Sequence, residues 1–229
     1  MGMPLVHTTR LADAYRRFLQ SSDPLAFVAD VDEHYSASTL CRLLTAGDAE
    51  SRRASALALG TLGDRGSLEP LGRALSDPDR GVRLVADDSL RGRLIRDAAP
   101  AHHQQLLHAM HRIDGDAHAA ALPMLIRLCE AAPLYAEAHH QLAICWHALD
   151  DPATASRAYA ACLWRCRYHY AAWNGLGRCR LALGEPHRAL RHIGRAVEVM
   201  PDFELGRVAI RSIRRALRRR GTNDAGPTV

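Results

Sequence analysis

Apolar residues between positions 136 and 203 recur with the spacing of amphipathic helices, and the pattern repeats with a period of about 34 residues. When 136–169 is set above 170–203, small and apolar residues coincide in pairs: Leu142 with Leu176, Ala143 with Gly177, Ala155 with Ala189, Tyr159 with Ile193 and Cys162 with Ala196. In the second copy, Gly184 is placed to end one helix, Pro186 to begin the next and Pro201 to end the unit. The pattern therefore predicts two helices in each unit.

The pattern extends beyond these two copies on both sides. Upstream, 102–135 matches the second helix of the unit, although its first helix matches poorly; the matching residues are Ala121, Leu125, Leu128 and Pro133. Downstream, 204–220 has apolar residues at helical spacing: Ala209, Ile210, Ile213, Ala216 and Leu217. We expect this last segment to be the solvating helix that closes a repeat stack.

The two copies resemble the tetratricopeptide repeat, whose pattern is Trp-x2-Leu-Gly-x2-Tyr, then Ala-x3-Phe, then Ala, then Pro. Six residues of the second copy match it directly: Trp173, Leu176, Gly177, Ala189, Ala196 and Pro201. Arg180 and Ile193 replace aromatic residues, and the first copy has Arg167 where the proline is expected. The resemblance implies stacked helical hairpins in which the first helices line a concave groove.

A shorter period of about 31 residues precedes these units. Five residues recur with it: Leu40, Leu44, Asp48, Arg52 and Leu59 reappear as Leu71, Leu75, Asp79, Arg83 and Leu90. The turn at 76–83 resembles that of a short HEAT-like repeat. This resemblance implies that the Asp caps the next helix and that the Arg one turn later joins a ladder of contacts between repeats. About one and a half to two copies fit between 36 and 97.

Together these patterns predict an all-α protein, an α-solenoid of stacked helical hairpins. We expect one helix at 9–20 and a junction between the two repeat types at 98–101. The expected domains are a capping helical segment at 1–35, HEAT-like repeats at 36–99, three tetratricopeptide-like units at 100–203, a basic capping helix at 204–221 and a flexible tail at 222–229.

The composition agrees with a helical, cytoplasmic protein. Aromatic residues make up 5% of the chain, fewer than a β-sandwich or barrel needs. All 30 basic residues are Arg, a bias that a genome rich in G and C produces along a whole chain, which suggests a bacterial source. Neither an 18-residue apolar run nor a secretory signal is present, so we expect no membrane span and interpret the six cysteines as reduced thiols.

Thirteen His and six Cys raise the question of a metal site. The tightest group is Cys162, Cys166 and His169, with His139 and His140 nearby in the sequence. Two thiols four residues apart would share a helix face, as zinc ligands can. The repeat register offers a simpler interpretation, because Cys162 coincides with Ala196 and Cys166 with Met200, where core residues belong. We therefore predict packed thiols, with no metal and no other cofactor.

No catalytic constellation is evident. The chain lacks Gly-x-Ser-x-Gly, a phosphate-binding Gly loop and His-Glu-x-x-His. The carboxylates at 87–88 are neighbours on an expected helix, where adjacent side chains point to different sides. Those at 150–151 fall in the turn between repeat helices. We therefore expect no enzymatic activity.

The groove is the main candidate site. Spacing of i, i+3 and i+7 along the first helices selects seven residues: Glu137, His140, Ile144, His147, Asn174, Arg178 and Leu181. This mixed surface suits an extended or helical segment of another protein, with some acidic groups. The sequence therefore predicts a non-catalytic scaffold or adaptor that binds a partner segment in the groove.

Positive charge is concentrated in one segment. Residues 1–100 contain 13 Arg and 14 Asp plus Glu, whereas 101–229 contain 17 and 11. Six arginines of the last helix are candidate anion contacts: Arg207, Arg211, Arg214, Arg215, Arg218 and Arg219. The alternative function is therefore binding of nucleic acid or an anionic surface. It is not favoured, because no aromatic residue is interleaved for base stacking and the apolar stripe of this helix suits burial.

Overall fold

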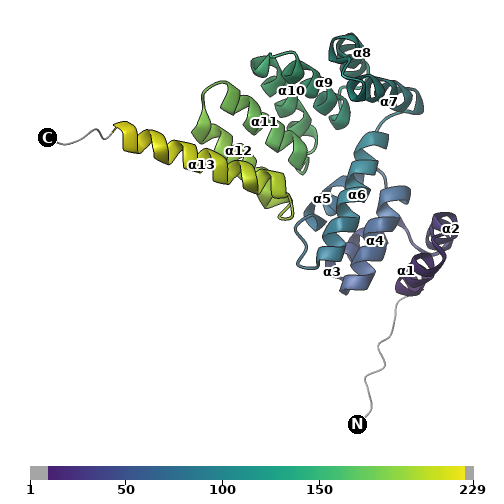
Figure 1. Ribbon diagram of the computed structural model, residues 1–229. Helices are drawn as coiled ribbons and strands as arrows, with labels where there is room; N and C mark the ends of the chain where they lie inside the picture. The colour runs from purple at the N-terminus through teal and green to yellow at the C-terminus, as the bar shows by residue number, and fades with distance from the viewer. Residues whose placement is uncertain (1–9, 225–229) are drawn as a thin grey trace. The chain divides into compact units, whose positions relative to one another are not determined.

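The computed structural model describes residues 10–224, with side chains described as far as Arg219, and is shown in Figure 1. This range contains thirteen α-helices and one 3-10 helix, with no strand among the described residues. The predicted all-α class is confirmed. The chain divides into two compact units, Met1–Leu94 and Ile95–Val229. No helix in the described range is both long and apolar enough to cross a membrane.

The first unit begins with two short helices where the sequence predicted one. The predicted helix at 9–20 appears as α1 (Arg10–Ser21), and α2 (Pro24–His34) follows it. The side chain of Asp23 accepts hydrogen bonds from the backbone amides of Leu25 and Ala26, and Pro24 occupies the first turn, where no amide partner is lost. This Asp-Pro start is the signal that identifies α2.

The remaining helices of the first unit are α3 (Ala37–Ala46), α4 (Ala49–Leu62), η1 (Arg65–Ser67), α5 (Leu68–Ala74) and α6 (Arg80–Arg96), whose last two residues belong to the second unit. Buried leucines form the core, among them Leu40, Leu59, Leu71 and Leu90. A Cβ on Gly60 of α4 would lie 2.6 Å from the Ser89 hydroxyl of α6, so these helices approach closely.

Aspartates of the first unit both cap helices and bind arginines. Asp79 accepts the amide of Val82 at the start of α6 and is also bound by Arg53 of α4. Arg52 donates to both carboxylate oxygens of Asp77 at 2.8 Å and to the carbonyl oxygen of Gly47 at 2.9 Å. These contacts fix the turn before α6 against α4.

The second unit is a series of helical hairpins. Its helices are α7 (Pro100–Asp114), α8 (His118–Ala131), α9 (Ala136–Ala148), α10 (Pro152–Arg165), α11 (Tyr170–Ala182), α12 (Pro186–Val199) and α13 (Glu204–Asp224). The helices α11 and α12 begin and end one repeat period after α9 and α10, so the predicted period is confirmed. The predicted junction at 98–101 lies in the connection from α6 to α7 and the start of α7. Of the predicted tail, 222–224 continue α13, and 225–229 lie outside the described residues.

The turn inside each hairpin has the same backbone conformation. Asp116, Asp150 and Gly184 have φ angles of 60°, 59° and 75°, in the left-handed region that ends a helix. Each follows the one before it by one repeat period, so the register includes the turn from α7 to α8. Between successive hairpins, Gly175 of α11 faces the ring of Tyr159 on α10, and within a hairpin Gly177 faces Ile193 of α12, which allows close helix packing.

Candidate functional site

The predicted groove residues on α9 and α11 form a partly accessible surface. Ile144 and His147 on α9 are half-buried, as is Asn174 on α11, while Arg178 is exposed. Burial lowers the pKa of His147, and the nearby positive charge of Arg178 lowers it further. His147 and Arg178 therefore lie close together although they belong to different repeat units.

Glu137 differs from the expectation that it lines an open groove. Its side chain is only 9% exposed, and His140 beside it is also largely covered. Both belong to a buried cluster with His169, the residue that precedes α11. Glu137 therefore offers little accessible surface to a partner, and the face of α9 presents fewer polar side chains than the spacing indicated.

Three side chains hold the Glu137 carboxylate. The Oε1 atom lies 3.1 Å from Nδ1 of His140 and accepts from the amide of Gln141 at 2.7 Å, while Oε2 lies 3.1 Å from Nε2 of His169. Burial raises the pKa of Glu137, but the two histidines outweigh it and hold the pKa well below its usual range. Burial, followed by the proximity of His169, lowers the pKa of His140. The cluster is therefore a buried carboxylate held by hydrogen-bond partners on three side chains.

The spacing of this cluster also fits a metal ion. One ligand atom each from Glu137, His140 and His169 lies within 4.8 Å of the others, and two histidines with a carboxylate is a common ligand set. The other ring nitrogen of His169 argues against a bound metal. This Nδ1 atom accepts a hydrogen bond from the backbone amide of Ala172 at 3.2 Å. A neutral ring that accepts at Nδ1 has its proton on Nε2, the atom that would bind the metal. The geometry therefore favours hydrogen bonding to Glu137.

The position of His169 explains why the cluster joins successive hairpins. His169 and Tyr135 are the N-cap residues of α11 and α9, and Phe203 precedes α13 at the same register. Tyr135 donates to the carbonyl of Ile95, and Phe203 packs on Tyr170 with ring centroids 5.2 Å apart. Each of these side chains reaches a residue 32 to 40 positions earlier in the sequence. The recurrence of aromatic or imidazole rings one repeat period apart was the signal for these contacts.

The cysteines lie where the repeat register placed core residues. Cys145, Cys162, Cys166 and Cys179 are buried, and the other two are half-buried. Cys179 lies 3.4 Å from Nδ1 of His147, the arrangement of a nucleophile and a base. Burial nevertheless raises the pKa of the Cys179 thiol, and a buried thiol with a raised pKa is a poor nucleophile.

Five of the six arginines predicted to contact anions fall into two groups on α13. Arg207 and Arg211 pair with Glu204 of the same helix. Arg214, Arg215 and Arg218 are exposed and form no ion pair with a carboxylate among the described residues. The apolar stripe of α13 packs against α12, where Ile213 joins Ala189 and Ile193 in the core. Of these five arginines, those of the second group lack a carboxylate partner in the described range and can bind an anion.

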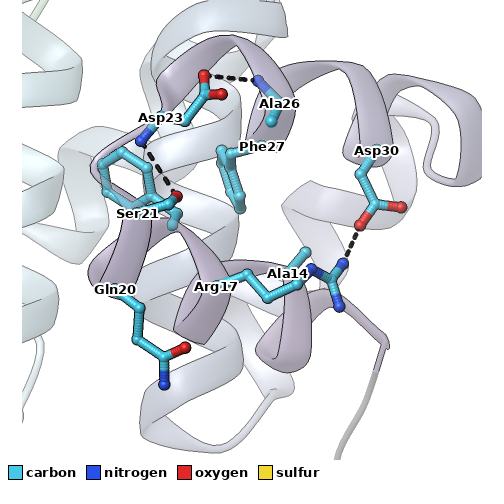
Figure 2. Close-up of a pocket in the computed structure, with 9 residues that line it drawn as sticks. Ala14, Arg17, Gln20, Ser21, Asp23, Ala26, Phe27 and Asp30 are labelled. Carbon is cyan, nitrogen blue, oxygen red and sulfur yellow. Dashed lines mark hydrogen bonds and ion pairs between the residues drawn. The ribbon is translucent and has the colours of Figure 1, made fainter.

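A pocket of about 500 Å³ opens between α1 and α2 in the first unit (Figure 2). Polar groups in its lining bind one another within the hairpin. Arg17 pairs with Asp30, and Asp23 accepts a hydrogen bond from the backbone amide of Ala26. Its apolar wall is formed by Phe18 and Phe27, whose ring centroids lie 5.6 Å apart. We interpret this pocket as the junction of the two helices and assign no ligand to it.

No protein-family model and no curated protein matches the chain. Among solved structures, the first TPR of Spaghetti bound to an HSP90 peptide is 18% identical, with 51% of this chain and 92% of that chain covered and a TM-score of 0.49. The type III secretion chaperone SycD of Yersinia enterocolitica, in complex with a peptide of the translocator YopD, is 16% identical, with 51% and 95% covered and a TM-score of 0.49. YrrB, a TPR protein with an unusual peptide-binding site, is 16% identical, with 86% and 96% covered and a TM-score of 0.46. These values are too low to transfer a function to this chain.

Proposed function

We propose that the second unit is a non-catalytic adaptor module that binds a segment of another protein along α9 and α11. The observation that supports this proposal is that Arg178 is exposed and has no carboxylate partner among the described residues. Its side chain is exposed, lies near His147 and forms no ion pair with a carboxylate in the described part of the chain. An exposed cation without a partner, on the helix face that the repeat register assigns to the groove, suits an acidic group of a bound segment.

The neighbouring residues complete a surface for a peptide. Asn174 offers one acceptor and two donor hydrogens, which suit the backbone of an extended chain. Ile144 is half-buried, and Leu181 is 44% exposed, so both offer apolar contact. The partner is accordingly a segment with acidic and apolar side chains, and the adaptor functions in the bacterial cytoplasm that the composition favours.

Selection from a random dodecapeptide display library against the full chain tests this function. We expect selected peptides rich in Asp and Glu, and we expect Arg178→Ala to raise their Kd about tenfold, the effect of losing one charged contact. Arg191→Ala is the matched control, because Arg191 is an exposed arginine on α12. Selection of no peptide, or equal binding by the two variants, would contradict the proposal.

A second candidate function is binding to an anionic polymer or surface through α13. It is supported by Arg214, Arg215 and Arg218, which are exposed and unpaired with carboxylates over the described range. Replacing these three and Arg219 with Gln should abolish binding to single-stranded DNA or to phosphatidylserine vesicles. If the wild-type chain binds neither probe at roughly physiological salt, this candidate is excluded.

For the first unit we propose HEAT-like repeats that support the adaptor. The helix cap of Asp79 and the pairing of Arg52 with Asp77 are the kind of contacts that such repeats use between neighbours. Removal of residues 1–94 should leave peptide binding by the second unit measurable but should lower its yield of folded protein. An unchanged yield and affinity would show that the first unit has a separate role.

A further inference from the structure

The helix face proposed to bind a partner has an equivalent on α13, for which the sequence predicts a basic cap with candidate anion contacts. Because α13 begins one repeat period after α11, it occupies the position of another first helix. In this register Asn174, Arg178 and Leu181 correspond to Val208, Ser212 and Arg215. Val208 is 45% exposed, although an apolar residue of a purely capping helix would be buried or replaced by a polar one.

An apolar pocket lies between the end of α11 and α13. It encloses about 310 Å³ and is lined by Leu181, Pro186, Ser212, Ile213, Ala216 and Leu217, together with the turn at Gly184. Ser212 contributes the only polar side chain to this lining. The volume is at the lower end of the roughly 300–1,000 Å³ that ligand pockets occupy, so it suits one bulky side chain better than a cofactor.

Arginines without carboxylate partners flank this pocket. Arg178 lies one turn before Leu181 on α11, and Arg214, Arg215 and Arg218 alternate with the lining residues on α13. None of these four pairs with a carboxylate among residues 10–219, whereas Arg180, Arg188 and Arg195 nearby are each paired with a glutamate. Residues 170–219 contain 11 Arg and 4 Asp plus Glu, so the surface around the pocket is strongly positive.

We propose that this pocket binds a bulky apolar side chain of an acidic partner segment, with Asp or Glu residues on either side of that side chain paired to the flanking arginines. The inference rests on the proposed function and adds an anchor site to it. The apolar pocket explains why a peptide, and not a simple anion, is the occupant, and the arginines explain why the peptide is acidic.

Peptides from the dodecapeptide selection provide the probe. We expect them to share a Leu, Ile, Phe or Trp flanked by acidic residues. Ala216 is exposed at the pocket, so Ala216→Phe should fill it without disturbing the core and should weaken binding about 10- to 100-fold, the contribution of one buried apolar side chain. The control is Ala160→Phe, at an exposed alanine of α10.

A second variant tests the pocket in case Ala216→Phe fails to fold. Leu181→Ser removes an exposed wall of the pocket and should also weaken binding about tenfold, while replacing the anchor residue of the peptide with Ser should make wild type and both variants bind equally weakly. If peptides bind and depend on Arg178 but neither variant changes their affinity, the pocket assignment fails and the proposed function stands. If no peptide is selected, the proposed function fails. Binding of DNA or phosphatidylserine vesicles that is lost with the α13 arginines but unaffected by Ala216→Phe would overturn the peptide as occupant.

Discussion

The Nε2 atom of His169 lies 3.1 Å from an oxygen of Glu137, and this contact joins the residue before α11 to the first turn of α9. The two side chains are 7% and 9% exposed, so the carboxylate depends on protein donors and not on water. A buried charge is tolerated only when it is fully hydrogen-bonded. The stacking of the α11–α12 hairpin on the α9–α10 hairpin is therefore coupled to one carboxylate.

Replacing this carboxylate with an amide should destabilise the second unit. In Glu137→Gln the new amide group would point a donor at another donor, so we expect a loss of about 2–3 kcal/mol in the free energy of unfolding. All three Trp residues, at 146, 164 and 173, lie in the second unit, so urea unfolding followed by Trp fluorescence measures it. Glu198→Gln, at an exposed glutamate, is the control and should change stability by less than about 0.5 kcal/mol. Equal effects would rule out the structural role of the cluster.

Stability of the second unit should fall as the pH is lowered below about 6.5. The folded-state pKa of His140 is below its usual 6.5, so the unfolded chain binds more protons than the folded one in this range, and stability rises with pH. Glu137 acts in the same direction at lower pH. Its folded-state pKa is depressed, so its contribution is complete above about 4.5 and is lost as the pH falls through the folded value.

Urea unfolding at pH 7.5 and 5.5 measures the histidine part of this dependence. His140→Gln should be less stable than wild type at pH 7.5 but should lose less stability between the two pH values. His108→Gln, at an exposed histidine of α7, should retain the wild-type slope. A His140→Gln variant with the full wild-type slope would show that other groups cause the dependence.

In the first unit, Arg52 should not be replaceable by Lys. Its guanidinium binds both oxygens of Asp77 and the carbonyl of Gly47, and a single ammonium cannot make all three contacts. The two side chains are 17% and 9% exposed, so solvent screens the pair little. We expect Arg52→Lys to cost about 1–3 kcal/mol, measured by urea unfolding with far-UV circular dichroism. Arg73→Lys, in an exposed pair with Glu69, should have almost no effect, and a similar loss from both would refute the argument.

The repeat pattern predicted the helices of the second unit well because helix starts depend on local residues. Pro152 and Pro186 lie in the first turns of α10 and α12, and Gly184 has the left-handed conformation after α11. The register of α13 was missed for a physical reason. Arg207 and Arg211 occupy the positions of Trp173 and Gly177. The sequence of α13 therefore lacks the residues with which a first helix packs against the following helix of its own hairpin.

The Glu137 cluster could not be predicted from spacing alone. Counting i, i+3 and i+7 identifies a helix face but not the residue of the next unit that covers it, and His169 lies 32 positions from Glu137. Similarly, the pocket beside α13 depends on the distance between two helices, which the sequence pattern does not define. Contacts between successive hairpins therefore account for most of the site features that the sequence pattern did not predict.

Two glycines in repeat helices should respond oppositely to the same substitution. In an open helix, Gly→Ala stabilises by about 0.5–1 kcal/mol because alanine loses less backbone entropy on folding. Gly194 of α12 has no atom within 4 Å of a new Cβ, so Gly194→Ala should gain about this amount. At Gly175 of α11 the new Cβ would lie 2.3 Å from the Tyr159 ring, which is buried and cannot move aside. Gly175→Ala should therefore cost about 1–3 kcal/mol, measured by urea unfolding with Trp fluorescence, because overpacking outweighs the propensity gain. A stabilising Gly175→Ala would show that α10 and α11 are not packed as closely as the structure has them.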